Sequence, residues 1–181
     1  MTIWFTSDTH YFHTNILKHA NRAYLCVEDM NEDLIKRYNE VVKPKDTVYH
    51  LGDFSFGNKK DTASVIRRLN GTIHLILGNH DKVIKGSIKD MFESVSHYKE
   101  IKGPDKRKII LCHYAFRVWN GSHRGAWNLH GHSHGTLEDL GIKQIDVGVD
   151  VHDMYPISME EIEVEMSKRG FDAPDHHGQR K

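Results

Sequence analysis

The stretch Thr72-Ile-His-Leu-Ile-Leu-Gly-Asn-His-Asp81 joins an apolar run to a short polar cluster. The near-continuous apolar part is typical of a buried strand in a parallel or mixed sheet. The polar part, Gly78-Asn-His-Asp81, follows directly, and ligands collect beyond the carboxyl ends of such strands. The stretch therefore predicts an α/β fold with a functional site at one edge of a sheet.

Four other polar clusters follow or end apolar runs in the same way. They are Asp8-Thr-His10, Gly52-Asp53, His113 and Gly131-His-Ser-His134. Within the first and the last cluster, the ligand candidates are two residues apart, so both side chains leave one face if the strand geometry continues. Carboxylate, imidazole and amide groups bind hard to borderline divalent cations, and two cations can share one carboxylate. We expect a binuclear metal site where five strand ends converge.

In this order, the clusters resemble the calcineurin-like metallophosphoesterases, whose pattern is Asp-x-His, Gly-Asp, Gly-Asn-His-Asp/Glu, His and Gly-His-x-His. The resemblance covers roughly the first 150 residues. It implies an α/β (α+β) fold, a four-layer αββα sandwich in which helices flank two stacked mixed sheets. It also implies a ligand set: Asp8, His10 and His134 for one metal, Asn79, His113 and His132 for the other, and Asp53 as the bridge.

The resemblance further implies a phosphoesterase with two divalent ions, Mn first, with Fe, Zn, Ni and Co as alternatives. A water that bridges two such ions loses a proton near neutral pH and attacks phosphorus. His80 is expected to donate a proton to the departing alkoxide, or a hydrogen bond to the transition state. Asp81 is expected to hold the His80 ring, and Asp53 completes the catalytic set.

The segment after Gly52-Asp53 indicates the substrate class. The phosphoprotein phosphatase branch carries Asp-Arg-Gly there, whereas this chain has Phe-Ser-Phe-Gly57. The missing arginine would have bound a phosphomonoester dianion through two hydrogen bonds. The chain looks more like the small bacterial and bacteriophage branch, and we expect a phosphodiesterase. A phosphomonoesterase acting on nucleotides or proteins, a nuclease and a noncatalytic metal-binding scaffold are the alternatives.

Four further residues are expected to bind the substrate: Arg117, His13, Trp119 and His123. Three of them lie between two ligand-bearing strands, which is expected to place them beside the metals. Arginine can form two parallel hydrogen bonds to a phosphate, and tryptophan can stack on a base or a sugar. The alternative for Trp119 is packing beneath its own loop. His13 is either part of the site or a loop residue without a catalytic role.

Composition agrees with one enzyme domain at 1–170, followed by a polar tail at 171–181 that is expected to be disordered. Lys plus Arg equals Asp plus Glu at 25 each, so no global basic field indicates a nucleic-acid partner. Two cysteines, Cys26 and Cys112, are expected to be reduced. We expect a cytoplasmic protein without a membrane segment or an obligate protein partner. Its substrate would be a small phosphoester, a nucleotide or an oligonucleotide.

Between the clusters, helical and strand patterns alternate. Helices are expected at 31–42, 61–69 and from Ser158 onward, and strands at 93–101, 106–111 and 143–149. Asn31 is expected to cap the first helix, and Ser158 to form a capping box with Glu161. His50 and His74 lie inside apolar runs and are expected to be hydrogen-bonded core histidines.

Overall fold

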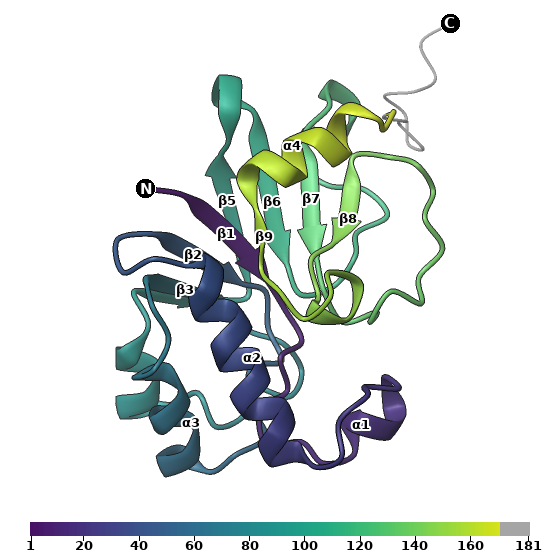
Figure 1. The fold of residues 1–181 in the computed structure, drawn as a ribbon. Helices are drawn as coiled ribbons and strands as arrows, with labels where there is room; N and C mark the ends of the chain where they lie inside the picture. The colour runs from purple at the N-terminus through teal and green to yellow at the C-terminus, as the bar shows by residue number, and fades with distance from the viewer. Residues whose placement is uncertain (171–181) are drawn as a thin grey trace, which may run out of the picture.

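The computed structural model describes residues 1–170, and the tail for which disorder is expected lies outside the described residues. Two mixed sheets form the centre of the fold (Figure 1). Apolar side chains of the two sheets, among them Phe5, Leu51, Ile109 and Leu111, are fully buried in one shared core. Stacked sheets of this kind with flanking helices confirm the predicted fold class.

The first sheet has the strand order β4-β3-β2-β1-β9. Its strands are β1 at Ile3–Thr6, β2 at Thr47–His50, β3 at Thr72–Ile76, β4 at Ser94–Ser96 and β9 at Ile157–Ser158. The first four strands pair in parallel, and β9 pairs with β1 in the antiparallel sense. The parallel pairing brings the carboxyl ends of β1, β2 and β3 to one edge.

The second sheet has the strand order β5-β6-β7-β8. Its strands are β5 at Tyr98–Lys102, β6 at Lys108–Cys112, β7 at Trp127–His130 and β8 at Gln144–Asp146. β5 and β6 form the predicted antiparallel hairpin, whereas β6, β7 and β8 are parallel. The predicted strand at 93–101 is divided, because β4 pairs in the first sheet and β5 in the second.

Helices cover the outer face of the first sheet (Figure 1). They are α2 at Val27–Val41, α3 at Lys59–Ile66 and the 3-10 helix η1 at Gly86–Met91, whereas the short α1 at Ile16–His19 lies apart from the strands. α2 begins earlier than expected, with Cys26 rather than Asn31 at its N-cap. Asn31 lies inside the helix, and its side chain accepts a hydrogen bond of 3.0 Å from the Phe12 N–H. The residue therefore braces the loop after His10.

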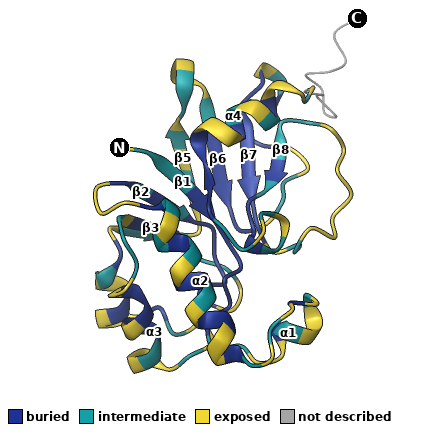
Figure 2. Cartoon of the chain, in the orientation of Figure 1, coloured by how far each residue is buried: buried dark blue, intermediate teal, exposed yellow. Residues whose placement is uncertain are grey.

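The second sheet is covered differently on its two faces. α4 at Met159–Ser167 begins with the predicted capping box between Ser158 and Glu161, and it packs into the core between the sheets. On the outer face, Ile110 is covered by Trp119 and Ala126 from the connection between β6 and β7. Figure 2 shows β6 and β7 as mostly buried strands. A loop with the short 3-10 helix η3, at Ser122–Arg124, thus provides this outer layer.

Other residue-level expectations also have structural outcomes. His50 is buried and lies 3.0 Å from the Thr9 hydroxyl, which confirms a core histidine. His74 is only partly buried and lies 2.7 Å from the Ser94 hydroxyl. Cys26 and Cys112 are free thiols. Within residues 1–170, no helix combines the length and apolar character that crossing a membrane requires.

Candidate metal centre

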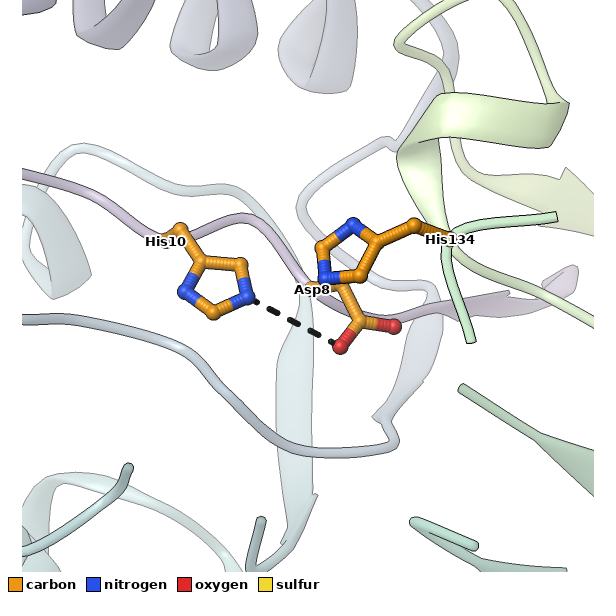
Figure 3. Close-up of side chains that lie close together, drawn as sticks. All are labelled: Asp8, His10 and His134. Atoms are coloured by element: carbon orange, nitrogen blue, oxygen red, sulfur yellow. Dashed lines mark ion pairs between the residues drawn. The ribbon is translucent and has the colours of Figure 1, made fainter. Parts of the chain in front are cut away.

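Six predicted ligands form two groups at the carboxyl edge of the sheets. One group contains Asp8, His10 and His134, the other Asp53, His113 and His132, and the donor atoms of each group lie within 4.8 Å of one another. In Figure 3, the rings of His10 and His134 and the carboxylate of Asp8 turn toward a common point. The dashed line there joins His10 Nε2 to Asp8 Oδ1 at 3.9 Å.

Asp53 lies between the two groups. Its Oδ2 is 3.6 Å from Nε2 of His10 and 3.6 Å from Nε2 of His113. Its Oδ1 accepts a hydrogen bond of 2.9 Å from the His80 N–H, which fixes the carboxylate. Asn79 Oδ1 lies 3.1 Å from His113 Nε2 and so joins the second group. One carboxylate oxygen facing both groups is the arrangement expected of a bridging ligand.

Unsatisfied buried atoms show that these residues fit cations. Within residues 1–170, Asp8 Oδ1 and both ring nitrogens of His10 are buried without a hydrogen-bond partner. Leaving such a group unsatisfied costs about 1–3 kcal/mol, a cost that coordination removes. Two divalent cations would bring four positive charges against the carboxylates of Asp8 and Asp53, leaving a net charge near +2. That excess suits an anionic phosphate ester.

Burial and neighbouring charges set the protonation of the ligands. Burial lowers the pKa of His10 to about 2, so its ring is neutral and able to coordinate. Burial also acts to raise the pKa of Asp53, but the hydrogen bond and charge of His113 and the His80 N–H hold it at about 2. Burial raises the pKa of Asp8 to about 7. A cation favours the ionised form of Asp8, so binding would release a proton.

The ligand loops do not continue the strand geometry. Five ligand residues have left-handed backbones: Asp8 (φ 57°), His10 (φ 51°), Asp53 (φ 54°), His132 (φ 68°) and His134 (φ 47°). The expectation that strand alternation aligns the paired ligands is therefore wrong, because tight turns aim them instead. Left-handed residues other than glycine are costly and cluster at functional sites. The turns also require close approach, since a Cβ on Gly78 would lie 2.6 Å from the Asp53 nitrogen.

Asp81 has a different role from the one expected. Its carboxylate accepts hydrogen bonds from the N–H groups of Asp53 (2.9 Å), Phe54 (2.8 Å) and Gly78 (2.8 Å). In the part of the chain that is described, no hydrogen bond joins it to the His80 ring. The idea that Asp81 orients this ring is therefore corrected. Its two oxygens brace the loops after β2 and β3, which carry Asp53 and Asn79.

His80 and His13 both lie at the site. The exposed ring of His80 is centred 5.9 Å from that of His10 and 4.7 Å from that of Phe56. The ring of His13 stacks on Phe56 at 3.7 Å and lies 5.3 Å from His10. Phe56 was not identified from the sequence, although it lies in the segment after Gly52-Asp53. These rings form an aromatic rim beside the metal ligands.

Of the three residues expected from the connection between β6 and β7, Trp119 packs in the outer layer of the second sheet. Because these strands are parallel, the connection must return from the metal edge to the opposite end of the sheet. Trp119 is buried against Ile110, and its Nε1 donates to the Ala126 carbonyl at 2.9 Å. The packing alternative thus describes Trp119. Arg117 is exposed. His123 lies on η3, shortly before β7 begins.

Two residues that sequence reasoning missed support the first ligand group. Asp150 Oδ2 lies 2.6 Å from Nδ1 of His134, which leaves Nε2 of this ring for a cation. Arg22 grips the same carboxylate through bonds of 2.7 and 2.8 Å and donates to the carbonyls of Asp8 and Thr9. Although burial acts to raise the pKa of Asp150, His134 and Arg22 hold it at about 2. Asp150 follows an apolar run, a signal that could have found it; Arg22 has no such signal.

Comparisons with known proteins agree with this geometry. Residues 1–146 match the model of the calcineurin-like phosphoesterase superfamily domain. An uncharacterized protein of Methanocaldococcus jannaschii is 35% identical over 176 residues, covering 93% of this chain and 92% of that protein. The Gene 66 protein of Mycobacterium phage L5 is 29% identical over 178 residues, covering 81% and 86%. The crystal structure of a protein of unknown function from Aquifex aeolicus superposes with a TM-score of 0.73 at 29% identity, covering 90% of this chain and 98% of that one.

Proposed function

This chain belongs to the calcineurin-like phosphoesterase superfamily, and from that premise we propose that it is a metal-dependent phosphodiesterase. Family membership and the two candidate ligand groups support a metal-dependent hydrolase of phosphoesters. The preference for diesters goes further and depends on how positive charge is distributed around the site. A diester carries one negative charge, whereas a monoester near neutral pH carries up to two.

The observation that supports a preference for diesters is the hydrogen bonding of Arg22. Its guanidinium is already committed to the Asp150 carboxylate and to the carbonyl groups of Asp8 and Thr9. It is also buried, with no side-chain exposure. It cannot turn to form a bidentate contact with a phosphate dianion. A site with a net charge near +2, whose neighbouring Arg22 is already occupied, suits a singly charged diester.

The chain's own residues would bind, orient and protonate the substrate. Two divalent cations bound by the seven ligands would lower the pKa of a bridging water and neutralise the phosphate. Asp81 and Asp53 accept hydrogen bonds from the N–H groups of Gly78 and His80, which fixes the backbone on either side of Asn79. The exposed His80 ring would deliver a proton to the departing alkoxide. No side-chain nucleophile is needed.

The donor set also supports a choice of metal. Four imidazoles, one amide and two carboxylates suit borderline first-row cations. We propose Mn, with Fe, Zn, Ni or Co as alternatives. The two free thiols agree with a cytoplasmic protein, and a small phosphoester or a nucleotide is the proposed partner.

The test is a panel of phosphodiesters and phosphomonoesters with a common 4-nitrophenolate leaving group, assayed with added Mn. We expect a higher kcat/KM for diesters. Enzyme treated with a chelator is the control for contaminating hydrolases, and its activity should return with metal. A kcat/KM for monoesters above that of every diester would favour the phosphomonoesterase alternative. Cleavage confined to oligonucleotides would favour the nuclease, and inactivity on the whole panel despite two bound cations would favour the scaffold.

A further inference from the structure

A cavity of about 410 Å³ opens beside the metal centre, between α1 and the loop that carries His132 and His134. Besides these two ligands, it is lined by Ile16, His19, Ser133, Thr136 and Leu137. Small-molecule sites have volumes of about 300–1,000 Å³, so the cavity can hold an organic group. Since one ligand from each metal group lies in its wall, a phosphate on the metals would have a substituent within reach of it.

The wall of the cavity is part apolar and carries no permanent charge. Ile16 is buried in the core, and Leu137 is 50% exposed at the rim. The Thr136 hydroxyl donates to the Ser133 carbonyl. The Ser133 hydroxyl has no hydrogen-bond partner among residues 1–170 and is available to a ligand. Without Lys, Arg, Asp or Glu in this wall, the cavity does not favour a second phosphate and suits an uncharged group.

The cavity and the proton donor serve different parts of a substrate. His80 does not line the cavity, and its ring lies against Phe56 on the aromatic rim. Diester hydrolysis forms a bond from phosphorus to the water oxygen and breaks one bond to an alkoxide. The departing alkoxide takes a proton, while the second ester group stays on phosphorus. If departure occurs beside His80, the cavity is left for the group that stays.

We propose that this cavity binds the retained, uncharged alcohol substituent of a phosphodiester. This inference rests on the proposed function and explains how the site would recognise a diester, because a monoester has no second substituent. Ile16 and Leu137 would contact its apolar part, and Ser133 would donate a hydrogen bond to a hydroxyl or ether oxygen. The retained group would be an uncharged alcohol unit of limited size, such as a nucleoside or a glycerol-like alcohol, rather than a polyphosphate.

The experiment changes the cavity from the α1 side, away from the loop that holds the metal ligands. His19→Trp should fill the cavity, and Lys18→Trp, an exposed neighbour that does not line it, is the matched control. The substrates are 4-nitrophenyl diesters whose retained group is methyl or phenyl. We expect His19→Trp to lower the phenyl-to-methyl ratio of kcat/KM by about tenfold, a typical size for a steric clash in a pocket. Lys18→Trp should keep the wild-type ratio.

Two further measurements distinguish failure of the cavity proposal from failure of the proposed function. Methyl(phenyl)phosphinate cannot be hydrolysed, because both of its substituents are joined to phosphorus through carbon, and its calorimetric affinity relative to dimethylphosphinate should fall by the same factor in His19→Trp, which tests the cavity even without turnover. Phe56→Ala tests the opposite rim. The inference is overturned if His19→Trp keeps both the wild-type ratio and the wild-type affinity, or if Phe56→Ala alone changes the ratio. Diester turnover in such an enzyme would leave the proposed function standing. Absence of diester turnover, with phosphinate binding sensitive to His19→Trp, would overturn only the proposed function.

Discussion

The metal edge and the connection between β6 and β7 are neighbours in sequence but are held by different forces. At the metal edge, left-handed turns aim the ligands, and buried carboxylates such as Asp81 fix the surrounding backbone through three N–H groups. In the connection, Trp119 and Ala126 pack on Ile110. Polar bonds therefore determine geometry in the first region, and apolar burial determines stability in the second. Substitutions in the two regions should have different consequences.

The largest effect is expected where one residue serves both ligand groups. Asp53→Asn removes the charge of the oxygen that faces His10 and His113. At least one cation per chain should be lost, and hydrolysis should be abolished with it. Elemental analysis after dialysis, together with kcat/KM, measures both. At most one ion in metal-saturated wild type would rule out the binuclear centre.

The next effect separates chemistry from metal binding. His80→Ala should lower kcat by ~10²- to 10⁴-fold for substrates with poor leaving groups, the range expected for a general acid. Metal content should not change, because the His80 ring is not in either ligand group. Acidic leaving groups such as nitrophenolate should suffer less. Equal losses for good and poor leaving groups would assign His80 a positioning or electrostatic role.

A substitution of Asp150 tests whether its contact with the ligand His134 raises metal affinity. Asp150→Asn weakens the contacts to His134 and Arg22, and such losses lower metal affinity by about 10- to 100-fold. The group of Asp8, His10 and His134 should lose its cation first, while the other group keeps its own. Titration with Mn measures both affinities. Asp139→Asn removes a similar bidentate pair with Arg169 on the surface and is the control. An equal loss at both sites would indicate general destabilisation.

The contrast between the two regions also explains which residues could be placed correctly from the sequence. The ligands were predictable because each is a polar residue that follows a buried strand, and parallel strands bring such positions to one edge. The role of Asp81 was not predictable, since its partners are backbone groups of loops whose turns are not encoded by periodicity. Trp119 was misplaced because proximity to His113 in sequence was taken as proximity in space. A connection between parallel strands must leave this edge before the next strand begins.

Acid should lower the free energy of unfolding through His50, a buried histidine. Burial lowers the pKa of His50 to about 3, from 6.5. The unfolded chain therefore binds the extra proton between these values. The stability due to neutral His50 is present above pH 6.5 and is lost as pH falls toward 3, by up to about 1.4 kcal/mol per pH unit. Urea midpoints at pH 7, 5 and 4 should fall less steeply for His50→Gln. Identical slopes would show that His50 does not carry this dependence.

The smallest effect on catalysis is expected from substitutions in the connection between β6 and β7. One of them, Trp119→Ala, should nevertheless lower stability strongly. Trp119→Ala removes a side chain that is 92% buried against Ile110 and Ala126, since its exposed fraction is 8%. Truncation of a buried tryptophan costs about 3–5 kcal/mol, measured as a lower free energy of unfolding in urea. At temperatures where the variant remains folded, kcat/KM should stay within about twofold, because an edge fixed by its own polar bonds does not depend on this packing.

Arg117→Ala is the companion variant, and it should change neither quantity, since exposed substitutions usually alter stability by no more than about 0.5 kcal/mol. Both variants should retain two cations. A large loss of kcat/KM for diesters in Arg117→Ala, with unchanged stability and metal content, would return this connection to the substrate site. Unchanged catalysis in both variants would instead establish that chemistry is confined to the strand ends.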